Sequence, residues 1–185
     1  MSLIYQLTSN VRLFSSDDSP PSGRSDDPDD VLLSDVHHET LATTIANKFG
    51  ISYLSKAADS KAFEVVRVTE GFLFGENNRS IAPFVVSYKG NSHWVFFVLD
   101  TGSPDTYFSD QALKALNMCE DMIAWSVQIG GHQSTVHMAP PTPLLRGINV
   151  LGANFFKAHG VVKAEDYRTG KIKICIGGEW NLVHN

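Results

Sequence analysis

The chain has few cysteines, no long apolar run and no excess of positive charge. Its two cysteines, Cys119 and Cys175, are too few for a disulfide framework and favour a reducing, intracellular setting such as the cytoplasm. No apolar run reaches the length of a membrane-spanning helix, and residues 1–14 lack the basic start and apolar core of a signal peptide. Fifteen basic against twenty acidic residues give a net charge of −5, which does not support nucleic-acid binding. We therefore expect neither a nucleic-acid nor a membrane partner.

The N-terminal third differs in composition from the rest. Residues 15–35 consist largely of Ser, Asp, Pro and Gly, which predicts an acidic linker, with an acidic docking tail as the alternative. Residues 36–49 have apolar residues near helical spacing, with Asp35 as a candidate N-cap and Gly50 as a stop. This pattern predicts a short amphipathic helix that packs on the domain, or else is recognised by a partner. We expect an N-terminal extension over 1–60 and a folded domain over 61–180.

From residue 63 onward the pattern changes to short extended segments separated by turns. A helix is expected over 110–117, with Ser109 as its N-cap. The expected strands are 63–68, 71–74, 81–88, 93–99, 123–129, 135–139, 161–164 and 171–176. Many short strands, Gly-rich turns and one or two short helices predict a small all-β barrel or folded sheet.

One of these strands ends in a carboxylate. The apolar run 95–99 is typical of a strand buried on both faces, and Asp100 follows it directly. A buried charge is costly without partners, and the next residues can supply them. Thr101 and Ser103 carry hydroxyls, and Gly102 allows backbone amides to approach the carboxylate. An ordinary turn at a strand exit is the alternative interpretation.

Further motifs follow in a fixed order. Residues 127–132 end in a Gly-Gly-His hairpin tip, and residues 139–143 read Ala-Pro-Pro-Thr-Pro. Residues 150–152 read Val-Leu-Gly and precede a short helical segment, 153–159, and then Gly160. Together with Asp-Thr-Gly-Ser, this order resembles the retropepsin-like (retroviral-type) aspartic proteases. The resemblance covers roughly residues 80–176, about half of the chain.

The resemblance implies a fold and an activity. The fold would be the small retropepsin-like acid-protease barrel, and the activity would be aspartic endopeptidase action on protein or polyprotein peptides, without cofactor or metal. The mechanism needs two carboxylates that share one proton, whereas the chain has a single Asp-Thr-Gly. The active form would therefore be a homodimer with Asp100 of each subunit at the twofold axis. Two origins stay open, a retroelement polyprotein and a host protein of related descent.

The resemblance also implies roles for the neighbours of Asp100. Thr101 would bond across the dimer axis, Gly102 would present backbone to the substrate, and Ser103 would hydrogen-bond Asp100. Val150, Leu151 and Gly152 would give structural support, with Leu151 and Gly152 under the turn.

Three departures from the family pattern stand out, one being that the usual C-terminal interface strand is not obvious and that residues 171–176 resemble the closing strand of the cellular relatives. The retroviral enzymes pair an acid after the turn with an arginine after the apolar-apolar-Gly element, and here Pro104 and Ala153 occupy those positions. The interval that holds the flap in those enzymes is reduced to residues 118–124, which predicts a short or absent flap. A non-catalytic, protease-like dimerisation or peptide-binding module is therefore the alternative function.

Overall fold

The computed structural model describes residues 35–119, 122–141 and 143–178. The predicted acidic linker, 15–35, lies outside these residues apart from Asp35.

Short strands dominate the described part of the chain. They are β1 (Val68–Phe74), β2 (Arg79–Tyr88), β3 (Asn91–Leu99), β4 (Tyr107–Phe108), β5 (Ala124–Ile129), β6 (His132–Met138), β7 (Asn149–Leu151), β8 (Val162–Asp166) and β9 (Lys171–Cys175). The helices are α1 (His38–Thr40), the π-helical η1 (Leu41–Ile45), α2 (Ala46–Phe49), α3 (Asp59–Ala62), α4 (Asp110–Ala115), α5 (Pro143–Arg146) and α6 (Ala153–Ala158).

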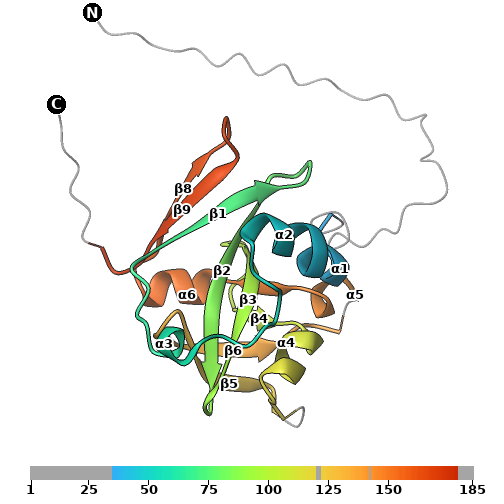
Figure 1. Cartoon of the computed structure of the whole chain (residues 1–185), viewed down its shortest axis with the longest axis vertical. Coiled ribbons are helices and arrows are strands. Elements are labelled where there is room, and N and C mark those ends of the chain that lie inside the picture. Colours follow the sequence, from blue (N-terminus) through green and yellow to red (C-terminus); the bar gives the residue numbers. More distant parts are fainter. Residues whose placement is uncertain (1–34, 120–121, 142, 179–185) are drawn as a thin grey trace, which may run out of the picture.

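The strands form one sheet that closes on itself. Their order is β3-β7-β4-β6-β5-β2-β1-β9-β8, and an additional pairing between β2 and β3 closes the first six strands into a barrel. β1, β9 and β8 extend the sheet beyond the barrel, and Figure 1 shows β8 and β9 as a projecting hairpin. The prediction of a small all-β barrel with few short helices is confirmed.

Two of the predicted strands, 63–68 and 71–74, do not form as separate strands. Residues 63–67 are not extended into a strand, and the segments expected at 63–68 and 71–74 are replaced by the single strand β1. Gly71 is not a break in this strand. A Cβ atom at Gly71 would lie 2.1 Å from the carbonyl oxygen of Ile81, so glycine permits a close approach of β1 to β2.

The sheet buries both of its faces. Along β3, Phe97 and Leu99 belong to the cluster inside the barrel, whereas Phe96 and Val98 belong to a second cluster on its outer face. This alternation is the ordinary two-residue period of a strand. The outer cluster consists of Val36, Leu41, Ile45, Ala46, Phe72, Ile81, Phe96, Val98, Ile148 and Val150.

The helical run α1–η1–α2 covers the outer cluster. Val36, Leu41 and Ile45 are fully buried there, and Figure 1 shows α1 and α2 beside β1 and β2. Gly50 ends the run in the left-handed conformation (φ 65°), as predicted. The expectation of Asp35 as N-cap is wrong, because His37 holds the cap position and makes no side-chain cap bond. The division of the chain at residue 60 stays a prediction.

The rim of the barrel matches the predicted capping. Ser109 precedes α4, and its Oγ accepts a hydrogen bond from the backbone N–H of Ala112 at 3.2 Å.

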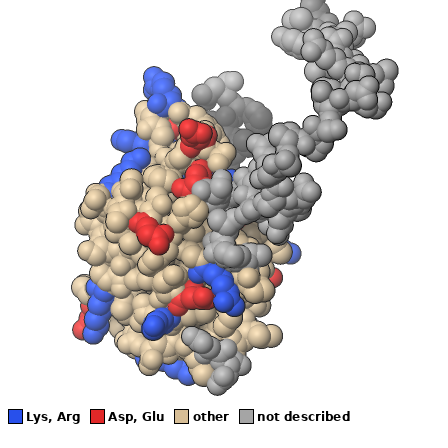
Figure 2. Space-filling model, turned by 90° about the vertical axis from the view of Figure 1, so that its right-hand side faces the viewer, with Lys and Arg blue, Asp and Glu red and all other residues tan. Residues whose placement is uncertain are grey.

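Within the described ranges, no helix combines the length and apolar character needed to span a bilayer. Figure 2 shows acidic and basic side chains interspersed on one face of the molecule.

Candidate active-site turn

Strands β3 and β7 bring together the two motifs that the sequence separates by about fifty residues. They pair in parallel, with Val98 opposite Val150 and Leu99 opposite Leu151. One residue further, the backbone N–H of Asp100 donates to the carbonyl oxygen of Leu151 at 3.1 Å. The Asp-Thr-Gly-Ser turn and the Val-Leu-Gly segment therefore form one site.

The carboxylate of Asp100 is held by the backbone of its own turn. The N–H of Gly102 donates to Asp100 Oδ1 at 2.9 Å, and the N–H of Ser103 donates to the Asp100 carbonyl oxygen at 3.2 Å. The Ser103 hydroxyl does not make the expected bond to Asp100. It donates to the carbonyl oxygen of Asp105 at 2.8 Å, because the chain turns again directly after Ser103. Thr101 and Gly102 are exposed and Asp100 is partly exposed, so the turn lies at the surface.

Gly152 lies directly beneath the loop that follows Asp100. A Cβ atom at this position would lie 2.1 Å from the Asp105 carbonyl oxygen, so any larger residue would push the loop away. The next two amides then bond to the same loop. Ala153 N–H donates to the Ser103 carbonyl oxygen at 2.8 Å, and Asn154 N–H donates to that of Pro104 at 3.0 Å. These backbone bonds join α6 to the turn at the two positions where the retroviral acid–arginine pair is absent.

Thr106 is a supporting residue that the sequence motifs did not reveal. It is fully buried, and its Oγ1 accepts a hydrogen bond from Gly152 N–H at 3.1 Å and donates to Asn154 Oδ1 at 2.7 Å. Asn154 Nδ2 also donates to the Thr135 carbonyl oxygen at 3.3 Å. Thr106 and Asn154 thus connect the turn, the start of α6 and strand β6. No local sequence signal marked Thr106, because its partners lie 46 and 48 residues further along the chain.

Two ionisable residues flank the turn on the side of β4 and β6. Asp105 Oδ1 lies 3.9 Å from His137 Nε2, and both side chains are partly exposed. Burial and the charge of Asp105 raise the pKa of Tyr107, the first residue of β4. Tyr107 therefore stays neutral beside the turn.

The interval between α4 and β5 is short, as predicted. The residues of this interval that the structure describes, 116–119 and 122–123, contain no strand. Ile123 is 84% exposed and Met122 is 48% exposed. Their apolar side chains therefore lie at the surface just before β5.

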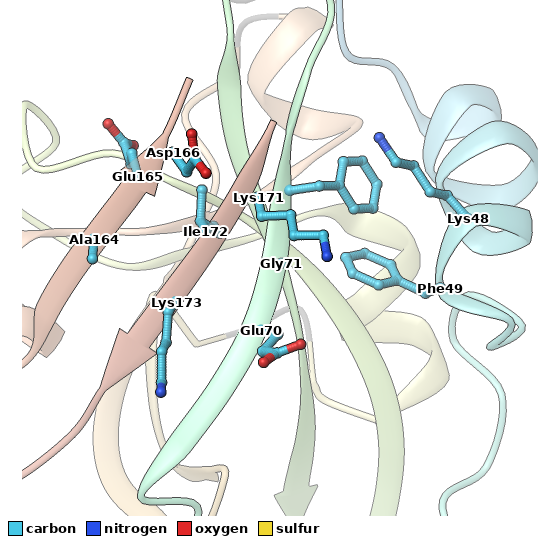
Figure 3. Close-up of a pocket in the computed structure, with 11 residues that line it drawn as sticks. Lys48, Phe49, Glu70, Gly71, Ala164, Glu165, Asp166, Lys171, Ile172 and Lys173 are labelled. Carbon is cyan, nitrogen blue, oxygen red and sulfur yellow. The ribbon is translucent and has the colours of Figure 1, made fainter. Parts of the chain in front are cut away.

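A separate cavity of about 550 Å³ lies between α2, β1 and the β8–β9 hairpin. Figure 3 shows Lys48 and Phe49 on its α2 side, with Glu70 and Gly71 on β1 and Lys171 on β9. Asp100 is not among the lining residues. No group of three or more potential metal ligands occurs in the described ranges.

Comparisons with known proteins give one kind of match. No protein-family model matches the chain, and no curated protein matches it. Among solved structures, the chain is similar to the crystal structure of a retropepsin-like aspartic protease from Rickettsia conorii. The sequence identity is 15% and the TM-score is 0.39, and the match covers 58% of this chain and 90% of that chain. The activity in that name belongs to the Rickettsia protein.

Proposed function

We propose that this chain is an aspartic endopeptidase that hydrolyses peptide bonds as a homodimer, with Asp100 as its catalytic residue. The observation that carries the proposal is the hydrogen-bonded Asp100 turn beside Leu151 and Gly152. The turn presents a carboxylate at the surface on a rigid support, which is what a general acid–base group requires.

Two Asp100 carboxylates at a twofold axis would share one proton. Like charges at close range cannot both ionise easily, so the pair titrates in two macroscopic steps. The ionised carboxylate accepts a proton from a water molecule, and that water attacks the scissile carbonyl. The protonated carboxyl group donates a hydrogen bond to the carbonyl oxygen and stabilises the charge that develops there.

The neighbouring residues would support this chemistry. The N–H of Gly102 orients the carboxylate of Asp100, because it donates to Oδ1. Exposed Thr101 lies beside Asp100 and is available to bond to its copy in the partner subunit. Val150 and Leu151 are buried, and Gly152 allows the close packing of the loop.

The proposal is tested by peptide cleavage at acidic to neutral pH, with wild type beside Asp100→Asn and the dimer state measured in the same buffer. Cleavage by the wild type that Asp100→Asn abolishes is the expected result. Cleavage that persists in Asp100→Asn would refute the proposed role of this residue.

A protease-like dimerisation or peptide-binding module is the second candidate function. The short interval before β5 favours it, because a flap excludes water and orders the substrate. A confirmed dimer that binds extended peptides and cleaves none of them would support this alternative. A monomer at working concentration would count against the protease, because each Asp100 would lack its partner.

A further inference from the structure

Residues 35–50, called the strap here, cover the barrel face that continues from Asp100. Phe96 and Val98 point to the outer face of β3, and Asp100 follows Val98 at the same two-residue spacing. Continued by one residue past the end of β3, this spacing places Asp100 on the same side of the sheet as the apolar strip. Phe96 is fully buried and Val98 is 2% exposed, since the strap packs over both.

The covered strip extends across neighbouring strands at one level. Val98 lies opposite Val150 on β7 and opposite Ile81 on β2, and Val150 lies opposite Tyr107 on β4. This row is two residues from Asp100. An extended peptide that crosses Asp100 needs apolar surface for its side chains on either side of the scissile bond. The row is the nearest such surface along β3.

We propose that the strap is an autoinhibitory element, which occupies the apolar part of the substrate groove. A peptide substrate with large apolar side chains next to the scissile bond displaces the strap when it binds. This inference rests on the proposed protease function and adds a regulation and a substrate class to it.

An ion pair fastens the strap near the catalytic turn. Asp35 Oδ1 lies 3.6 Å from Arg79 Nε, and the two side chains are 19% and 21% exposed. Asp35 Oδ2 also accepts a hydrogen bond from Asn77 Nδ2 at 3.2 Å. In the antiparallel pairing of β2 and β3, Ile81 lies opposite Val98. Continuing this pairing by two residues along each strand places Arg79 at the level of Asp100. The fastening point and the catalytic carboxylate therefore lie on neighbouring strands at the same end of the sheet.

The fastening is incomplete, which suits a segment that must leave. Buried side-chain atoms without a hydrogen-bond partner destabilise the arrangement that buries them. Asp35 Oδ1 and Arg79 Nε face each other at 3.6 Å, which is slightly too far for a hydrogen bond, and the buried His38 Nδ1 has no hydrogen-bond partner. The middle of the strap is the π-helical η1, a rare form that is frequent at functional sites.

The chain after the strap has anchors of its own on β3 and β7. Gly50 (φ 65°) separates the strap from Tyr53, whose hydroxyl accepts a hydrogen bond from Asn149 Nδ2 at 2.7 Å. Leu54 N–H donates to the Trp94 carbonyl oxygen at 2.9 Å. On its other side, α2 is separated from the β8–β9 hairpin by the cavity of Figure 3. The strap can therefore swing about Gly50 while the anchor at Tyr53 stays in place.

The first test compares Asp35→Asn with the wild type in peptide cleavage. Asp35→Asn removes the ion pair with a minimal change in shape, and kcat/KM for peptides with apolar residues at the cleavage site should rise roughly three- to ten-fold. Asp110→Asn is the matched control, because Asp110 also pairs with an arginine of another element, Arg146, at 4.0 Å. The control should leave kcat/KM unchanged. Equal rates for the wild type and Asp35→Asn would overturn the inference.

The second test follows the strap itself by hydrogen exchange in the full chain, with and without a statine-containing peptide inhibitor. Amides of residues 38–49 should exchange faster in the inhibitor complex, and those of β3 should not. If the amides of residues 38–49 were equally protected with the inhibitor bound, the autoinhibitory role of the strap would be refuted, and the protease proposal would stand. Absence of both cleavage and inhibitor binding in all variants would overturn the proposed function, and the inference with it.

Discussion

The backbone N–H of Asp100 donates to the carbonyl oxygen of Leu151 at 3.1 Å. This single bond joins the Asp-Thr-Gly-Ser turn to the Val-Leu-Gly segment. It extends the parallel ladder between β3 and β7 by one step, so the position of Asp100 depends on the packing of β7 and α6. Residues that hold α6 against the turn should therefore affect both stability and activity.

Gly152→Ala should displace the loop after Asp100. The added Cβ would lie 2.1 Å from the Asp105 carbonyl oxygen, and backbone cannot yield as a side-chain end can. We expect a loss of about 1–3 kcal/mol in the free energy of unfolding. Under the proposed function, peptide cleavage should fall about 100-fold or more, because small misplacements of catalytic groups are costly. Urea unfolding and kcat measure the two effects.

Gly178→Ala is the control for this substitution. A Cβ at Gly178 meets no atom within 4 Å, so stability and kcat should remain at the wild-type values. A Gly152→Ala protein as stable as the control would contradict the close packing under the turn.

Thr106→Val should weaken the connection between the turn and α6. Valine has nearly the same shape but cannot accept the hydrogen bond from Gly152 N–H or donate to Asn154 Oδ1. Leaving these buried groups without Thr106 should cost about 1–3 kcal/mol of unfolding free energy. Thr106→Ser keeps the hydroxyl and should retain most of the stability and kcat. Thermal and urea denaturation measure the unfolding free energy of both variants. If Thr106→Ser were less stable than Thr106→Val, the methyl group of Thr106 would contribute more to stability than its hydroxyl group.

Asn149→Leu should lower the free energy of unfolding more than the small change in side-chain volume suggests. Asn149 is fully buried, accepts a hydrogen bond from Ser109 N–H at 2.9 Å, and donates to Tyr53 Oη at 2.7 Å and to the Phe96 carbonyl oxygen at 3.1 Å. Leucine would leave these groups unpaired, with an expected loss of about 3 kcal/mol in unfolding free energy. Urea unfolding provides the measurement.

Tyr53→Phe isolates one of these contacts. Burial raises the pKa of Tyr53 to about 12, so its hydroxyl is neutral at every ordinary pH. Asn149 Nδ2 retains its bond to Phe96 in this variant, and the loss should be only about 1 kcal/mol. Equal losses for the two variants would mean that Tyr53 alone accounts for the role of Asn149.

The sequence predicted the parts of the site that depend on neighbours in the chain. The apolar run before Asp100, the Val-Leu-Gly segment and the Ser109 cap are local patterns, and each lies where local chemistry places it. The closed barrel follows from many short strands. The helical stop at Gly50 is likewise a local property, because glycine readily adopts positive φ.

The parts that the sequence missed depend on contacts between distant segments. Asp35 was expected to cap a helix, but Arg79 and Asn77 lie close to it only after β2 has folded beside the strap. Residues 71–74 were expected as a separate strand, but β1 runs through Gly71, where it approaches Ile81 closely. Thr106 matched no motif, because its partners are Gly152, which caps α6, and Asn154 in α6, 46 and 48 residues further on. Such partners are fixed by tertiary packing and not by local pattern.

Glu165 should make stability depend on pH on the acid side. Burial alone would raise the pKa of Glu165, but hydrogen bonds from Lys163, Ser80 and Tyr167 outweigh it and lower the pKa from 4.5 to about 2. A lowered pKa in the folded state contributes stability that is fully present above about pH 4.5 and is lost as pH falls towards 2. We would measure the unfolding free energy with urea between pH 6 and pH 2 (roughly the range in which carboxylates titrate). As pH falls, it should decrease less steeply for Glu165→Gln than for the wild type. Lys163→Met removes the ion pair at 2.7 Å and should also make the decrease in unfolding free energy less steep. The same decrease in all three proteins would refute the coupling between Glu165 and stability.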